Sequence, residues 1–98
     1  MKRVIVEPGA QADIRSAFRW YEGQKIGLGR EFLQEIRRMV QFIRSGPESY
    51  AVVHRNVRRA NLRRFPYGLF FRLQDESVIV IACIHGHRNP RQWMTLGR

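Results

Sequence analysis

The chain has 98 residues, of which 44% are hydrophobic and 27% charged, and its formal net charge is +10. A chain of this length builds one core, so we expect residues 1–98 to form a single domain, and the composition excludes a disordered chain. No apolar run approaches the roughly 20 residues that a membrane span needs, so we expect no membrane-spanning helix and no membrane partner.

The chain is predicted to begin with a short strand. Residues 3–7 alternate around Val4 and Val6, and Pro8 and Gly9 follow them. Because the alternation starts directly after Met1, we expect no signal peptide.

The sequence next predicts two amphipathic helices. A tight, glycine-containing connection at residues 23–29 joins them, and Ser45, Gly46 and Pro47 end the second helix. In each helix the apolar side chains recur at helical spacing and form one stripe. The stripe of the first helix consists of Ala10, Ile14, Ala17, Phe18 and Tyr21. In the second helix the stripe consists of Phe32, Leu33, Ile36, Met39, Val40 and Ile43, and the polar face of Glu31, Gln34, Glu35, Arg38 and Gln41.

The second half of the chain is predicted to form three strands. Alternation places Arg59, Asn61 and Arg63 on one face of the first of them, and Pro66 interrupts before the next. The run from Val78 to Ile84 is apolar throughout, as in an inner strand that is covered on both faces. Residues 50–53 fit either a short strand or an extended linker. The order β-α-α-β-β-β predicts an α+β fold, in which an N-terminal helical hairpin packs on one face of an antiparallel sheet.

The end of the apolar run is the first candidate functional site. His85, His87 and Arg88 follow the run directly, Asn89 and Pro90 stop the chain, and Trp93 comes shortly after. Packing alone does not require such side chains at the end of an inner strand, where sites tend to be built.

Arginine side chains form the second candidate site. Residues 1–49 carry nine basic and six acidic side chains, whereas residues 50–98 carry nine basic and two acidic ones. The guanidinium group suits phosphates and carboxylates, so we expect an acidic partner: nucleic acid, a nucleic-acid machine or an acidic protein segment. The alternative interpretation is a solvated edge strand. The candidate side chains are Arg55, Arg58, Arg59, Arg63 and Arg64, extended by Arg88 and Arg91.

The chain resembles the RelE/ParE superfamily of toxins from bacterial type II toxin–antitoxin modules, and within it the ParE (plasmid stabilisation) branch. The resemblance covers nearly the whole chain and is most specific in two segments, Arg64-Phe65-Pro66-Tyr67 and the block from His85 to Pro90 with Trp93. It is supported by Ala12-Asp13-Ile14, Trp20-Tyr21, Phe32 and Ile36.

The resemblance implies a small cytoplasmic toxin that a cognate antitoxin neutralises in a toxin–antitoxin hetero-oligomer. ParE-type members inhibit DNA gyrase by protein–protein binding, which is our leading expectation. RelE-type members cut messenger RNA inside the ribosome without a metal. For that alternative His85, Arg88 and Arg59 are the candidate catalytic residues. Two departures count against it: Gly68 stands where RelE-type toxins often carry an arginine, and Met94-Thr95 stand where a tyrosine would supply the acid.

Three further candidates concern single side chains. His85 and His87 with His54 have the ligand type for a metal, but no carboxylate or cysteine at a convincing spacing completes the set, so we predict neither a metal nor a cofactor. Cys83 is predicted to be a small buried side chain rather than a nucleophile. Trp20 and Phe42 flank the helical stripes and are the candidates for an exposed apolar surface that an antitoxin covers.

Overall fold

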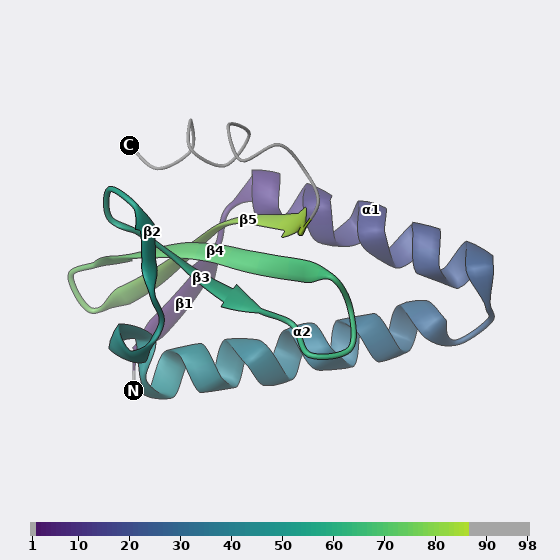
Figure 1. Cartoon of the computed structure of the whole chain (residues 1–98), viewed down its shortest axis with the longest axis horizontal. Coiled ribbons are helices and arrows are strands. Elements are labelled where there is room, and N and C mark those ends of the chain that lie inside the picture. Colours follow the sequence, from purple (N-terminus) through teal and green to yellow (C-terminus); the bar gives the residue numbers. More distant parts are fainter. Residues whose placement is uncertain (1, 87–98) are drawn as a thin grey trace.

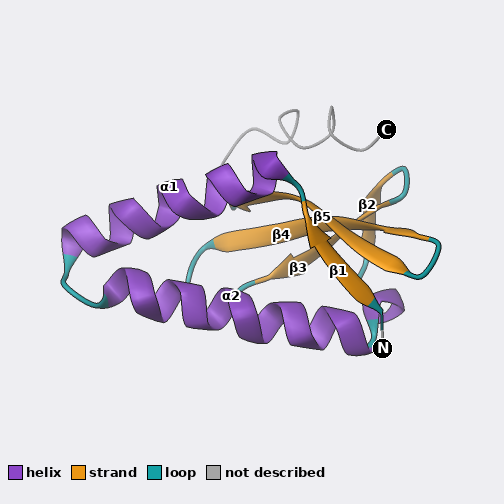
Figure 2. Ribbon diagram, turned by 180° about the vertical axis from the view of Figure 1, so that it is seen from behind, coloured by secondary structure: helices purple, strands orange, loops and turns teal. Residues whose placement is uncertain are grey.

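Two antiparallel helices pack on one face of a five-stranded sheet in the computed structural model, which describes residues 2–86 (Figures 1 and 2). The strand order is β1-β5-β4-β3-β2. This arrangement confirms the predicted α+β fold with a helical hairpin on one face of the sheet. The elements are β1 (Arg3–Val6), α1 (Pro8–Gln24), α2 (Leu28–Ser45), the short 3-10 helix η1 (Pro47–Ser49), β2 (Val52–His54), β3 (Val57–Asn61), β4 (Tyr67–Gln74) and β5 (Ser77–His85). Neither helix has the length and apolarity that crossing a membrane requires.

The sheet differs from the predicted one at both of its edges. At one edge, residues 52–54 form the additional strand β2, which pairs antiparallel with β3. At the other edge, β1 runs parallel to β5, with Val4 opposite Val78. The helical hairpin is the long connection that a parallel arrangement needs, because it returns the chain to the sheet before the antiparallel strands begin. The sheet is therefore antiparallel except for the β1–β5 pair.

The strand β5 is buried on both faces, as its apolar run predicts. Every residue from Val78 to Cys83 is buried. The register shifts by one residue where Phe70 pairs with Ala82 but Phe71 pairs with Val80, so β5 contains a bulge. Beyond the bulge, Cys83 faces the helices, as Val80 does before it.

Four aromatic rings, which we call the aromatic cluster, hold the helices to the sheet. They belong to Tyr21, Phe32, Phe65 and Tyr67. The centroid of the Phe65 ring lies 4.8 Å from that of Tyr21 and 5.3 Å from that of Phe32, and both pairs meet edge to face. Since such pairs stabilise beyond the area they bury, the cluster fixes the end of the hairpin against the start of β4.

The connection between the helices is shorter than the three glycines suggest. Only residues 25–27 lie outside the helices, and Gly27 has the positive φ of 91° that favours glycine. The carboxylate of Glu22 accepts hydrogen bonds from the backbone N–H groups of Gly27 and Gly29, both at 3.0 Å, and so caps the start of α2. At Gly29 a Cβ atom would lie 2.8 Å from the Phe18 ring, so glycine allows the close approach of the helices.

Glu35 corrects the prediction for the polar face of the second helix. Its side chain is 5% exposed and points into the molecule. The carboxylate accepts hydrogen bonds from the backbone N–H groups of Arg63 and Arg64 in the loop between β3 and β4. Glu35 therefore joins α2 to a loop that lies far away in the sequence.

Candidate functional site

A hollow of about 470 Å³, which we call the strand-end pocket, lies where β5 ends, beside the first candidate site. Its walls come from the end of α1, the start of β4 and the end of β5. The ring of His85 meets the ring of Tyr67 edge to face at 5.2 Å, and Trp20 meets Tyr21 in the same way at 5.2 Å. The lining residues are Trp20, Tyr21, Pro66, Tyr67 and His85.

Aromatic side chains dominate the described lining of the strand-end pocket. Among residues 2–86, this lining contains neither a carboxylate nor a guanidinium group. Burial, and next the neighbouring Tyr67, raise the pKa of the Tyr21 hydroxyl, so this group stays protonated at neutral pH. Trp20 is 60% exposed, and large exposed aromatic side chains beside a hollow are typical anchors for a partner protein.

Arg59 lies on the opposite face of the sheet from His85. Its side chain runs over Gly68, where a Cβ atom would lie 3.3 Å from the Arg59 Cγ and Cδ atoms. The Arg59 guanidinium lies 5.9 Å from the centroid of the Phe70 ring, which belongs to the apolar cluster on the face away from the helices. His85 instead packs against Tyr67, which belongs to the cluster under the helices. The sheet separates these two candidate catalytic residues.

Two of the remaining candidate arginines have internal partners. The Nη1 group of Arg58 donates hydrogen bonds to the carbonyl oxygens of Tyr50 at 2.7 Å and Glu48 at 3.2 Å. Arg64 forms an ion pair with Glu31 at 2.6 Å, and this hydrogen bond lowers the pKa of the Glu31 carboxyl. Both guanidinium groups are therefore engaged within the molecule, Arg58 with backbone carbonyls and Arg64 with an exposed carboxylate.

The other candidate arginines lie in turns and loops. Arg55 occupies the turn between β2 and β3 with a φ of 51°, and its Nε donates to the Nε2 atom of His54 at 3.2 Å. Arg63 is exposed in the loop between β3 and β4. Arg59 lies over the sheet, whereas Arg64 lies against α2. The candidate arginines therefore lie on several surfaces of the molecule and do not form one continuous patch. The candidates His87, Arg88, Arg91 and Trp93 lie outside the described residues.

The structure does not bring His54 and His85 together, and the third candidate metal ligand, His87, lies outside the described residues. His54 ends the edge strand β2, and β3 and β4 separate it from His85 on β5. Across residues 2–86, no three side chains of the ligand-forming types gather into a metal site.

Both apolar residues predicted to be exposed are exposed. Trp20 is 60% and Phe42 is 52% accessible. Sequence reasoning missed Ile26, which is 92% accessible at the tip of the hairpin. The exposure of Ile26 was predictable, because an isoleucine in the connection between two helices does not belong to the apolar stripe of either helix.

Cys83 is buried, as predicted. Its side chain faces the core, and its backbone N–H donates to the Asp13 Oδ2 atom at 3.0 Å. Burial, with a smaller contribution from the Asp13 carboxylate, raises the pKa of the Cys83 thiol to about 12. The Asp13 carboxylate therefore binds the backbone of β5.

Alkylation of Cys83 should therefore be slow in the folded chain. At pH 8 we expect iodoacetamide to react about a thousandfold more slowly than with an unstructured cysteine of pKa about 8.5, because the thiolate is the reacting form. The folded state favours the protonated thiol, so its contribution to stability is complete below about pH 8.5 and is lost as the pH rises toward the raised pKa. Mass spectrometry of quenched samples, with guanidinium-unfolded chain as the control, measures the rate. Equal rates in the two samples would contradict the assignment.

Comparison with known proteins gives a consistent result. Residues 4–90 match the family model described as ParE toxin of type II toxin-antitoxin system, parDE. The chain is similar to Toxin ParE2 of two Mycobacterium tuberculosis strains, each 27% identical over 90 residues, which is 91% of this chain and 86% of the relative.

Two solved structures share the fold. One is the chromosomal ParDE TA system from P. aeruginosa, with a TM-score of 0.75 and 20% identity over 87% of this chain and 96% of that one. The other is the isolated E. coli RelE toxin, with a TM-score of 0.66 and 16% identity over 98% of this chain and 96% of that one.

Proposed function

This chain belongs to the ParE toxin family of type II toxin–antitoxin systems, and from that premise we propose that it inhibits DNA gyrase by protein–protein binding and is neutralised by a cognate antitoxin in the cytoplasm. In this proposal the chain binds gyrase without catalysing a reaction. The strand-end pocket and the exposed arginines then supply contact surface.

The separation of Arg59 from His85 is the observation that supports binding over RNA cleavage. Metal-free cleavage needs a base, an acid and cations around a single phosphate. Arg59 and His85 lie on opposite faces of the sheet, an arrangement that does not favour contact of both with one phosphate. A binding protein has no such requirement, because an interface gathers energy from anchors spread over its area.

The test compares the two targets directly. With purified gyrase, the chain should inhibit DNA supercoiling, and induction in cells should leave ribosome-bound messenger RNA uncut. Replacing Arg59 or Arg63 by alanine should each weaken inhibition about two- to fivefold, as expected for exposed charges at an interface. Arg3→Ala, which removes one exposed charge from β1, is the matched control and should change inhibition little.

Two results would overturn the proposal. One is gyrase that keeps full activity at saturating concentrations of the chain. The other is messenger RNA cut at ribosomal sites after induction, with the cutting lost in Arg59→Ala. Neutralisation is tested separately, by co-expressing the acidic protein expected from a neighbouring reading frame and measuring growth and co-purification.

A further inference from the structure

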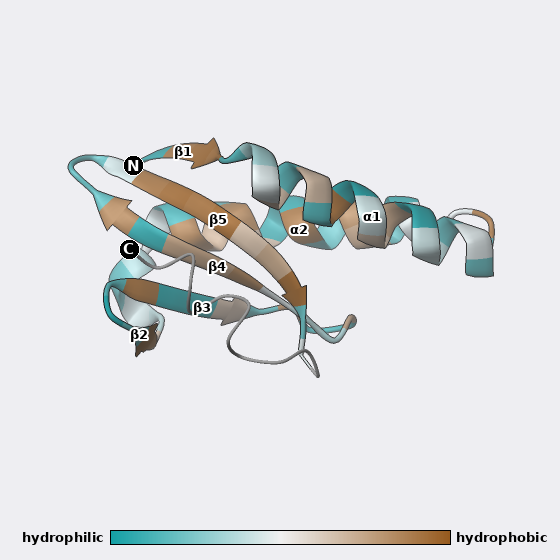
Figure 3. Ribbon diagram, turned by 90° about the horizontal axis from the view of Figure 1, so that it is seen from above, coloured by the Kyte–Doolittle hydropathy of each residue, from teal (hydrophilic) through white to brown (hydrophobic). Residues whose placement is uncertain are grey.

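The strand-end pocket is built from aromatic rings whose planes cross. It lies at the end of β5, which Figure 3 shows as a hydrophobic strand between β1 and β4. The rings of Trp20 and Tyr21 meet at 84°, those of Tyr21 and Tyr67 at 65°, and those of Tyr67 and His85 at 76°. Successive rings therefore stand edge to face, and the ring faces that bound the pocket point in different directions.

Two of these aromatic side chains carry hydrogen-bond donors. They are the indole N–H of Trp20, whose side chain is 60% exposed, and the hydroxyl of Tyr21, which stays protonated at neutral pH. Within residues 2–86, neither group takes part in a hydrogen bond. Since this part of the chain has no fully buried side-chain nitrogen or oxygen atom without a partner, the Tyr21 hydroxyl reaches the surface. Both groups are therefore available to donate to an acceptor from another molecule.

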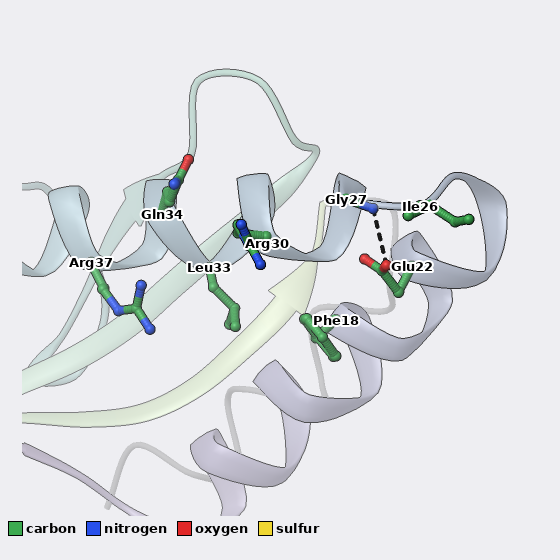
Figure 4. Close-up of a pocket in the computed structure, with 8 residues that line it drawn as sticks. All are labelled: Phe18, Glu22, Ile26, Gly27, Arg30, Leu33, Gln34 and Arg37. Carbon is green, nitrogen blue, oxygen red and sulfur yellow. Dashed lines mark hydrogen bonds between the residues drawn. The ribbon is translucent and has the colours of Figure 1, made fainter.

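A hollow between the two helices has a different chemistry. It measures about 570 Å³ and lies near the connection of α1 with α2. Figure 4 shows Glu22, Arg30 and Arg37 among its lining side chains. Carboxylate and guanidinium groups favour a charged occupant there, whereas the described lining of the strand-end pocket favours an uncharged one.

A cationic side chain precedes the strand-end pocket in the loop between β3 and β4. Arg63 is exposed and stands three residues before Pro66, which lines the pocket. Its backbone N–H donates to Glu35, but within residues 2–86 its guanidinium group forms no hydrogen bond and no ion pair. The neighbouring Arg64 is already paired with Glu31. An occupant of the pocket is therefore stabilised by a carboxylate that it places toward Arg63.

We propose that the strand-end pocket binds an extended, proline-containing segment of a partner protein, with an acidic residue beside the prolines. A polyproline II helix has no internal hydrogen bonds, so its carbonyl oxygens accept from donors such as the Trp20 indole N–H and the Tyr21 hydroxyl. Proline rings pack on aromatic side chains, and a rigid segment loses little entropy on binding. The proposal rests on the proposed function, in which the pocket supplies contact surface for the protein target, and it names the kind of segment that the pocket takes.

Two other occupants fit the strand-end pocket less well. Single-stranded nucleic acid binds by stacking its flat bases on aromatic faces. The three ring pairs of the pocket all cross at 65° or more, so none of these pairs offers two parallel faces that would sandwich a base. A second copy of the chain would bring together two molecules of net charge +10.

The test measures peptide binding to the full chain by fluorescence anisotropy. The probe is a labelled peptide of about ten residues in which glutamates flank a run of prolines, and the control peptide carries alanine in place of each proline. The proline peptide should bind at least about fivefold more tightly than the alanine peptide. Trp20→Ala should weaken its binding about tenfold, because an aromatic anchor and a donor are lost together. Phe42→Ala is the matched control, since it removes an aromatic side chain of similar exposure from the other helix, and circular dichroism checks that both variants fold.

The contribution of the acidic flank is tested at Arg63. Arg63→Glu should weaken binding of the proline peptide about three- to fivefold, and added salt should reduce this difference. Arg3→Glu changes the net charge equally and lies beside Ser77, at the opposite end of β5 from the pocket, so it should have little effect. Equal losses in these two variants would show a general charge effect and overturn the assignment of the acidic residue to Arg63.

Equal binding of the alanine peptide, or equal losses in Trp20→Ala and Phe42→Ala, would overturn the proposal. Tighter binding of a labelled thymidine oligonucleotide than of the proline peptide, with the same dependence on Trp20, would also overturn it. Gyrase inhibition by the same variants is measured in parallel. Full inhibition by Trp20→Ala would overturn the pocket proposal and leave the gyrase proposal intact, whereas peptide binding without inhibition of gyrase would overturn the gyrase proposal alone.

Discussion

Replacing Glu35 by alanine should lower the free energy of unfolding by about 3 kcal/mol, because two buried backbone N–H groups lose a charged acceptor at once. The groups belong to Arg63 and Arg64 in the loop that carries Phe65 and Pro66. For a domain of this size the melting temperature should fall by roughly 12–24 °C. Chemical denaturation followed by circular dichroism measures the change.

Glu31→Ala is the matched control, one turn earlier on the same helix. Glu31 pairs with Arg64 at the surface, where an ion pair contributes little, so we expect a change below about 1 kcal/mol. Similar losses in both variants would mean that Glu35 contributes only as a helix-forming residue. Retention of most of the stability in Glu35→Gln would show that acceptance of the amide hydrogens, rather than the charge, matters most.

The helices were predictable because their pattern is local. Apolar side chains at helical spacing placed both stripes, and Phe32 and Ile43 are buried as expected. Glu35 escaped the prediction because its partners lie in a loop distant in sequence. A signal existed, since position 35 falls on the buried stripe between Phe32 and Met39, where a carboxylate indicates a buried hydrogen-bonded partner.

The sheet was predictable only in part. The antiparallel pairing of β3, β4 and β5 follows from short connections, such as the two-residue turn of Asp75 and Glu76 between β4 and β5. The parallel pairing of β1 with β5 depends on where the helical hairpin returns the chain, which no local pattern encodes. The identity of β2 depends on pairing with β3 alone.

The candidate site shows the same division. The end of β5, which the sequence indicated as a candidate site, borders a hollow, and Trp20 is exposed as expected, but only the fold brings Trp20 to His85. Alternation correctly placed Arg59 with Asn61, yet it does not reveal that His85 faces the other way. The internal partners of Arg58 and Arg64 are carbonyls and a carboxylate on other elements, so these arginines appeared as available for binding as Arg59.

Replacing Phe32 by alanine should have the largest effect on the fold, a loss of about 4 kcal/mol, because its fully buried ring leaves a cavity that the rigid helix–sheet contact does not close. The ring contacts Tyr21, Phe65 and Tyr67, and two of these also line the strand-end pocket. We therefore expect a fall of roughly 15–30 °C in the melting temperature together with increased mobility of the pocket.

Phe42→Ala makes the same chemical change on the same helix at a side chain that is 52% exposed, so it should cost less than about 1 kcal/mol. Thermal denaturation of the two variants gives the comparison, and fluorescence quenching of the tryptophans reports the state of Trp20 beside the pocket. If Phe32→Ala were no more costly than Phe42→Ala, the aromatic cluster would not hold the hairpin to the sheet. The strand-end pocket would then need another source of rigidity. Tyr21 reaches the pocket from α1 and Tyr67 from β4, and within residues 2–86 the ring contacts that join these two elements all belong to the aromatic cluster.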